Sequence, residues 1–423
     1  MVGRSTRVIS FHSVLLTTFT LVACVPGAAR AQTSPPTPKK SAAAEHHVGP
    51  GWDTHPVFWL GKYGRLDLRV RLQEDRRATE VPLAEGTWFT VLRRVGVGGQ
   101  IAGGIDFEVN GEVGLIDPWR DAYVNVRRFP AFMVQGGKFK VPFGLDQLTS
   151  ESSFDFIYRS RIADQLSPGR DRGVMVHGRN IGHWLNYQLG VFVHDGGNSR
   201  TTDPARVVAG RTAAARVVVM PFATRTTSAF ADLQIAIDGT TGEVTPGLLS
   251  LRGRTAARAV FFSPRISVNG DVRRQGADLQ WRPGPFSVRA EIIRATVARD
   301  GLGDNGANLA AITARGWYVS GSWALTGERK ASGSDVPAHP LFEGGFGGVE
   351  LAARVERLGF DPHAAGVPSN ADSAQTYGVN WYLDRWSKVQ FNAIHERLAN
   401  AAIGPVPAHA AFWTHVVRFQ FKF

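Results

Sequence analysis

Basic side chains that could bind anions concentrate in one long segment, residues 136–173. The segment begins as a predicted strand in which Lys138 and Lys140 alternate with apolar residues. It then loses any regular period and carries four arginines, Arg159, Arg161, Arg170 and Arg172. A guanidinium group binds phosphate-like anions through paired hydrogen bonds, whereas an ammonium group acts as a point charge. A long polar connection between two strands indicates a functional loop.

Further candidate anion ligands lie in two strands predicted upstream of this segment. Residues 64–75 alternate strictly between leucine or valine and polar side chains, which is typical of a strand. The same alternation places Arg69, Arg71 and Arg94 on polar faces. Arg93 interrupts the apolar face of its own strand, which places it near a rim or a bend. Each of these cations could instead pair with a carboxylate of the wall, and the next predicted strand supplies three of them: Asp106, Glu108 and Glu112.

The sequence shows no sign of other chemistry. It has no G-x-S-x-G nucleophile motif, no H-E-x-x-H motif and no set of residues with metal-ligand spacing. The adjacent His46 and His47 lack a third ligand nearby, and the single cysteine, Cys24, lies close to the N-terminus. The sequence therefore predicts neither an enzyme nor a metal or cofactor site.

Strands of period two recur along the whole chain and must position these cations. They are predicted at residues 64–75, 88–99, 104–115, 121–128, 184–195, 231–238, 286–292, 317–325, 349–355 and 416–423. Many of their polar faces carry charges, which need water, so the apolar faces would meet lipid. Beyond the N-terminal segment no uncharged apolar run reaches the ~18 residues of a membrane helix. The pattern favours an all-β transmembrane antiparallel barrel.

Residues 1–31 are predicted to be a secretory signal, with a basic start, an apolar middle and a cleavage site after Ala31. A lipoprotein cleavage site before Cys24 is an alternative. Residues 32–50 are rich in Pro, Ser and Ala and are predicted to be disordered. Removing residues 1–31 from the chain of 423 residues leaves 392 residues, of which residues 51–423 are predicted to form the barrel. That length suits about sixteen strands of ~10 residues.

Several motifs in this order resemble the phosphate-selective porin family of bacterial outer membranes, the O/P type. They include GGKFKVPFG at 136–144 and LSPGRDRGV at 166–174. The resemblance implies a loop that folds into a trimeric barrel and passive, anion-preferring diffusion. It also implies a constriction built from an arginine pair, which Arg93 and Arg94 match, and from the loop arginines. The ending HVVRFQFKF resembles the signal by which the barrel-assembly machinery recognises a terminal phenylalanine, here Phe423.

Together these features predict a homotrimeric bacterial outer-membrane porin for small anions, with phosphate, pyrophosphate and polyphosphate as the leading solutes. The formal charge of +12, or +9 without the signal segment, fits an anion-handling surface as well as a basic solvated one. An exported chain is not expected to bind nucleic acid. The polar faces are mixed in sign, so a weakly selective general porin is the main alternative. A soluble periplasmic glycan-binding β-protein is the other.

Overall fold

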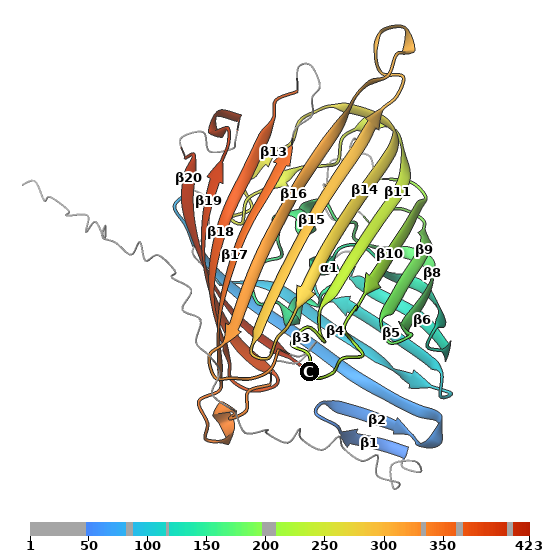
Figure 1. Ribbon diagram of the computed structural model, residues 1–423, viewed down its shortest axis with the longest axis vertical. Helices are drawn as coiled ribbons and strands as arrows, with labels where there is room; N and C mark the ends of the chain where they lie inside the picture. The colour runs from blue at the N-terminus through green and yellow to red at the C-terminus, as the bar shows by residue number, and fades with distance from the viewer. Residues whose placement is uncertain are drawn as a thin grey trace, which may run out of the picture. The chain divides into compact units, whose positions relative to one another are not determined.

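The computed structural model describes residues 48–81, 88–115, 118–196, 209–330, 336–360, 367–403 and 409–423. Sixteen antiparallel strands form one closed ring, so the predicted barrel and its strand number are confirmed (Figure 1). The strands are β3 (Gly64–Thr79), β4 (Trp88–Ile101), β5 (Ile105–Glu112), β6 (Trp119–Phe129), β7 (Phe132–Lys140), β8 (Arg170–Ile181), β9 (Leu185–Phe192), β10 (Thr212–Val219), β11 (Gln234–Leu248), β14 (Ser267–Trp281), β15 (Phe286–Arg299), β16 (Leu309–Ala324), β17 (Gly348–Phe360), β18 (Asn370–Tyr382), β19 (Ser387–Leu398) and β20 (Ala411–Lys422). Within the described residues, no helix is long and apolar enough to cross a membrane.

The ring closes where the last strand, β20, pairs with the first, β3. Their register runs from Thr414 opposite Thr79 to Lys422 opposite Arg71. An N-terminal hairpin of β1 (Val48–Trp52) and β2 (Pro56–Leu60) pairs with the first part of β3, which β20 does not reach. Residues 48–50 of the predicted disordered segment therefore belong to a strand. The predicted signal segment lies outside the described residues.

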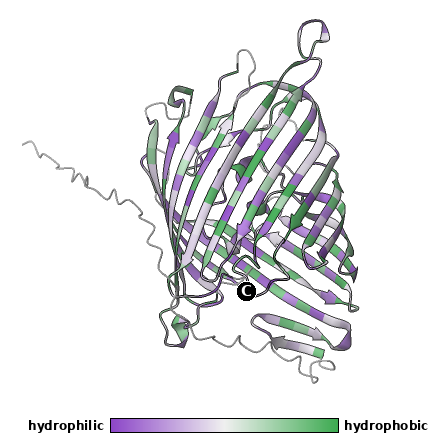
Figure 2. Ribbon diagram, in the orientation of Figure 1, coloured by the Kyte–Doolittle hydropathy of each residue, from purple (hydrophilic) through white to green (hydrophobic). Residues whose placement is uncertain are grey.

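Side chains alternate between the two faces of the wall as the sequence predicts. In β17, Glu350 and Glu356 are buried, whereas Leu351 and Val355 are exposed on the opposite face. Figure 2 shows the same alternation of polar and apolar residues along the strands. A wall whose outer face is apolar and whose inner face is polar matches a lipid exterior and a hydrated interior.

The connection from β7 to β8, residues 141–169, folds into the barrel. It contains two short helices, α1 (Leu145–Leu148) and α2 (Arg161–Gln165), and the 3-10 turn η3 (Glu151–Ser153). Other parts of the chain carry the 3-10 turns η2 (Gly61–Tyr63), η4 (Asp304–Gly306), η5 (Leu341–Glu343) and η6 (Ala401–Ile403). Gly144 begins the inward path at a φ of 74°, and a Cβ there would lie 2.6 Å from Glu291 Oε1. Both the backbone conformation and the space therefore require glycine. We call this connection the inward loop.

A second connection also fills the interior, which the sequence did not predict. Residues 249–266 join β11 to β14 and form a small sheet of β12 (Gly253–Arg254) and β13 (Val260–Phe262). The Phe262 ring stacks on Phe360 of the wall, with centroids 4.2 Å apart. The Asn370 side chain donates a hydrogen bond to the Phe261 carbonyl at 2.9 Å. We call residues 249–266 the second inward segment.

The two inward connections share an apolar core with the wall. Wall residues Ile293, Ile312 and Leu358 are fully buried against the second inward segment and against Ile162 and Leu166 of the inward loop. The interior is therefore packed with protein on this side and leaves room for water elsewhere.

Replacing Phe262 with alanine should lower the stability of the barrel by about 3 kcal/mol, because it removes a buried ring and leaves a cavity. Urea unfolding in detergent micelles, followed by tryptophan fluorescence, measures the change. Phe346→Ala is the matched control, since Phe346 is 67% exposed. Equal midpoints for both variants would mean that the second inward segment does not stabilise the barrel.

Candidate pore constriction

A cavity of about 270 Å³ lies inside the barrel, bordered by the inward loop, the second inward segment and the wall. Arginines dominate its lining: Arg94, Arg120, Arg159, Arg161, Arg170, Arg254, Arg258 and Arg418. Only three acidic residues line it, Glu112, Glu151 and Asp164. The cavity therefore has an excess of positive charge.

The inward loop reaches the cavity because its backbone is bound to the opposite wall. Asn380 donates to the Asp155 carbonyl at 2.8 Å, and Lys388 donates to the Phe154 carbonyl at 2.9 Å. The Asn392 side-chain oxygen accepts from the Ile157 amide at 2.8 Å. These strands, β18 and β19, are far around the ring from β7 and β8, where the loop begins and ends. The loop consequently crosses and narrows the lumen.

Arg94 connects the wall to the inward loop. Its Nη2 lies 3.0 Å from a Glu151 oxygen and 3.7 Å from a Glu112 oxygen, and its side chain is buried. Glu112 also accepts from Arg120 at 2.5 Å. Burial would raise the pKa of the Glu151 carboxyl, but the charges of Arg94 and Arg159 outweigh it and hold that pKa well below its usual range. Glu151 is therefore a carboxylate at neutral pH.

Two predicted anion ligands instead hold the inward loop in shape. Lys140 Nζ donates to the carbonyls of Gln147, Leu148 and Thr149 at 2.7, 3.2 and 3.0 Å. The Arg159 guanidinium donates to the carbonyls of Gln147 and Thr149 and lies 4.4 Å from the Phe154 ring centre. Hydrogen-bond donors that carbonyls already occupy are less available to a passing anion.

Arg161 is surrounded by carboxylates of the wall. Its Nε lies 3.5 Å from Glu396 and 3.8 Å from Asp372, and its backbone amide donates to Glu356 at 2.5 Å. Burial lowers the pKa of the Arg161 guanidinium, but Glu356 and Glu396 outweigh it and the net pKa is raised. Arg161 thus anchors α2 to the wall.

The remaining predicted residues inside the lumen differ in their partners. Arg170 donates to Asp121 at 2.9 Å, and Arg69 donates to Glu108 at 2.7 Å. Arg71 lies opposite Arg94 in the register of β3 and β4. Within the described part of the chain, no hydrogen bond or ion pair involves the Arg71 guanidinium.

Arg93, Lys138 and Arg172 lie on the outer face, which corrects the predicted lining at these positions. Arg93 is exposed on the face opposite Arg94, and its guanidinium donates to Thr90 at 2.5 Å. Lys138 and Arg172 are register partners and border a hollow of the outer surface with Trp119, which is 54% exposed.

An apolar cluster inside the barrel explains why Lys138 faces outward. Phe139 is buried there, with its ring centre 6.1 Å from that of Tyr123 and 5.3 Å from that of Phe192. Because successive strand residues point to opposite faces, the inward position of Phe139 turns Lys138 outward.

Sequence reasoning missed Arg120, Arg254, Arg258 and Arg418 as cavity residues. Arg418 lies on the polar face of the last strand, where its alternation could have revealed it, and it pairs with Asp75 at 2.7 Å. Arg254 and Arg258 belong to the second inward segment, which has no strand period. Among the described residues, no side-chain hydrogen bond or ion pair holds either guanidinium. They are the cavity cations most available to an anion.

The closed sixteen-strand ring with an inward loop defines an outer-membrane porin. Three solved structures illustrate the fold: a loop-deletion mutant of OmpT from Vibrio cholerae (12% identity, 85% of this chain and 100% of that one, TM-score 0.55), an anion-selective porin from Comamonas acidovorans (12%, 85% and 100%, 0.54) and the channel DcaP of Acinetobacter baumannii (8%, 89% and 100%, 0.54). At such identities the similarity shows the fold alone.

The family model for phosphate-selective porin O and P matches residues 94–423, so the chain belongs to that family. No curated protein matches the sequence. Family and fold place the protein in the bacterial outer membrane and indicate a channel rather than an enzyme. The match begins at Arg94, so Arg69, Arg71 and Arg93 lie outside it.

The inward loop should loosen in acid as Glu151 becomes protonated. A lowered folded-state pKa stabilises the loop fully above the unfolded pKa of about 4.3, and this stabilisation is lost as the pH falls toward the folded value. Single-channel conductance in planar bilayers should thus be steady from pH 8 to 5 and become noisy below about pH 4.

Glu151→Gln should remove the acid-dependent part of this change, because its side chain does not titrate. Glu343→Gln, at an exposed carboxyl of η5, is the control and should behave as the wild type. An acid transition of unchanged size in Glu151→Gln would show that another group controls the loop.

Proposed function

We propose that this porin carries small anions, with phosphate and pyrophosphate as its preferred solutes, through the arginine-rich cavity. The observation that supports this most directly is the charge of the cavity, with eight arginines against three carboxylates in its lining. Membership of the phosphate-selective family supports the same solutes.

The cavity can replace the water that a phosphate loses in a narrow channel. Guanidinium groups donate paired, charge-assisted hydrogen bonds to phosphate oxygens. Arg254 and Arg258 offer donors that no described side chain occupies, and Arg94 is close to them in the same lining. Conduction also requires that the ion leaves, which several weak sites permit better than one strong site.

The carboxylates of the lumen limit how strongly an anion is held. Arg94, Arg170 and Arg418 are each paired with a carboxylate at 3.0 Å or less. Such pairing leaves a smaller net field for the solute than the number of arginines suggests. This favours the second candidate, a general porin with weak anion selectivity.

The two candidates differ in reversal potential and in phosphate block. Purified protein in planar bilayers under a potassium chloride gradient should be anion-selective, and adding phosphate should lower its chloride conductance. A wild-type channel with large conductance, little selectivity and no phosphate block would favour the general porin.

Charge reversal inside the cavity should shift the reversal potential toward cations. In Arg254→Glu/Arg258→Glu, the phosphate concentration for half block should rise about tenfold, which corresponds to ~1.4 kcal/mol. Arg94→Glu should shift selectivity in the same direction. Arg93→Glu is the matched control, because it makes the same change one residue away on the outer face. If Arg93→Glu shifts selectivity as much as the others, the effect does not come from the cavity.

The homotrimer and the recognition of Phe423 by the barrel-assembly machinery stay predictions from the family resemblance. The structure adds that Phe423 is bound into the wall, since its backbone exchanges two hydrogen bonds of 3.0 Å with Val70. Phe423 is thus part of the seam that closes the barrel.

A further inference from the structure

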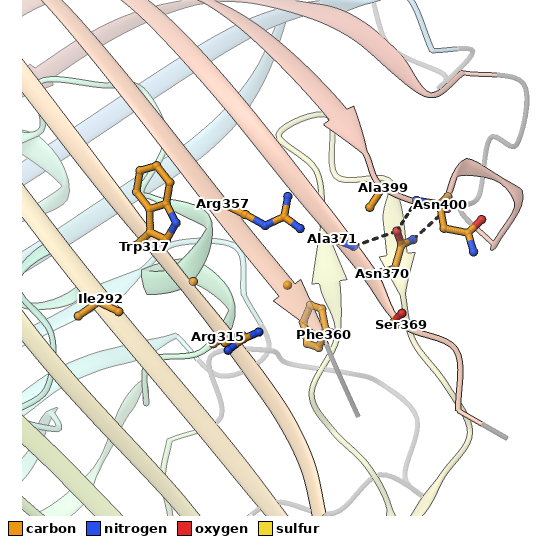
Figure 3. A pocket seen from close by; sticks show the side chains of 12 residues that line it. Ile292, Arg315, Trp317, Arg357, Phe360, Ser369, Asn370, Ala371, Ala399 and Asn400 are labelled. Atoms are coloured by element: carbon orange, nitrogen blue, oxygen red, sulfur yellow. Dashed lines mark hydrogen bonds between the residues drawn. The ribbon is translucent and has the colours of Figure 1, made fainter. Parts of the chain in front are cut away.

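The wall has a hollow that is separate from the constriction cavity. It measures about 610 Å³, and its lining residues include Trp317, Arg357 and Asn370 (Figure 3). The hollow and the cavity share no lining residue. A solute held in the cavity therefore does not contact the hollow, and the residues that recognise it are those of the cavity.

The inward loop and the second inward segment meet beside this cavity, where α2 contacts β12. Glu396 of β19 holds both of them. Its Oε1 lies 3.5 Å from Arg161 Nε of α2 and accepts a hydrogen bond of 2.5 Å from the Ala256 amide, which follows β12. The wall therefore fixes the position of α2 relative to the second inward segment.

Asp164 differs from the other two acidic residues of the cavity lining. Glu112 and Glu151 each lie within 3.0 Å of an arginine. Asp164 is exposed on α2, and among the described residues no lysine, arginine or histidine forms an ion pair with it. One of its oxygens accepts a hydrogen bond from the Gln165 side chain. Its other oxygen is left to accept a hydrogen bond from a solute.

Two arginines of the second inward segment lie close to Asp164. Burial lowers the pKa of the Arg254 guanidinium, the charge of Asp164 opposes this shift, and the charge of Arg258 adds to it. Arg258 has a φ of 66°, a costly conformation for a residue with a Cβ, in a turn closed by its amide on the Thr255 carbonyl at 3.0 Å. The cavity has the volume of about nine water molecules. One small anion can therefore contact all three charged groups.

A carboxylate in an arginine-rich cavity separates oxyanions into two classes. It has no proton to give, so it binds an anion only by accepting a hydrogen bond from a hydroxyl group of that anion. Phosphate keeps such a hydroxyl at neutral pH, whereas sulfate has lost both protons. An oxyanion without a hydroxyl meets the carboxylate as a like charge, and repulsion of the wrong ligand is one way to achieve specificity.

We propose that Asp164 makes the cavity select oxyanions that carry a proton, such as phosphate, over fully deprotonated ones such as sulfate. Arg254 and Arg258 donate to the charged oxygens of the anion, and its hydroxyl donates to Asp164. Sulfate offers acceptors to the arginines but no donor to the carboxylate. This inference rests on the proposed passage of anions through the cavity and names the residue that discriminates among them.

The test compares block by two anions of equal charge. At pH 8 phosphate is mainly HPO4²⁻, so it has the charge of sulfate and differs from it by the hydroxyl. Full-length protein in planar bilayers carries chloride current while phosphate or sulfate is added at constant ionic strength. Half block by phosphate should need about tenfold less anion than half block by sulfate, since a hydrogen bond to a charged group contributes at least this factor.

The outcomes for the wild type separate this inference from the proposed function. Phosphate block with equal or stronger sulfate block overturns the role of Asp164 and leaves the anion channel in place. Block by neither anion overturns both. Arsenate, which is protonated as phosphate is, should block in the phosphate range; arsenate that behaves like sulfate contradicts recognition of the hydroxyl, and this comparison needs no variant.

Asp164→Asn keeps the shape of the side chain but removes its charge and adds a donor. The concentration of sulfate for half block should fall about tenfold, while that of phosphate changes less, so the preference for phosphate should largely disappear. If Asp164 only stabilises the start of α2, block by the two anions changes equally, and an unchanged ratio overturns the proposal.

Two further variants complete the comparison. Asp164→Glu keeps the carboxylate and should retain a preference for phosphate, whereas a preference lost in this variant as completely as in Asp164→Asn would contradict recognition by a carboxylate. Asp304→Asn is the matched control, because Asp304 is an exposed aspartate in the first turn of η4 and does not line the cavity. It should give the wild-type ratio of sulfate to phosphate block.

Discussion

The hydrogen bonds that attach the inward loop to the far wall determine the rest of the interior. A loop of 29 residues carries many backbone groups into the lumen, and each must be bound there or stay in contact with water. The wall meets this need with polar side chains, among them Asn380, Lys388 and Asn392. Since those side chains must point inward, the polar alternation of β18 and β19 follows from the path of the loop as much as from the presence of water.

The same constraint explains why so many charges of the lumen are paired. Arg161 is buried on the loop and needs the carboxylates of β17 to β19 around it, because an isolated buried charge is costly. Arg94 and Glu151 join wall and loop in the same way on the other side. Most cations near the constriction are therefore engaged in ion pairs or hydrogen bonds that hold the inward loop in place. Arg254 and Arg258 of the second inward segment make no side-chain hydrogen bond or ion pair among the described residues, so they stay accessible.

Period-two alternation was enough to predict the barrel and the inward direction of Arg94, and the length of the chain predicted the number of strands. It also placed Arg69 on the inner face, where Arg69 and Arg94 pair with carboxylates of the lumen. It was wrong at Lys138 because an apolar cluster around Phe139 occupies the interior there, so the apolar face is the inner one. The same reversal occurs at Ile293 and Ile312, which pack on the second inward segment. Alternation separates two faces, but what fills the barrel decides which face is inside.

The seam between β3 and β20 has a consequence for how the protein is made. Its two strands are more than 300 residues apart in the sequence, and the pairing extends to the final residue through Val70 and Phe423. Until the last strand is in place, β3 presents unpaired backbone groups that could pair with another chain. The β1–β2 hairpin covers only the first part of that edge. The barrel therefore depends on its closing strand late in assembly, and a chain shortened by a few C-terminal residues would leave an open sheet edge in the membrane.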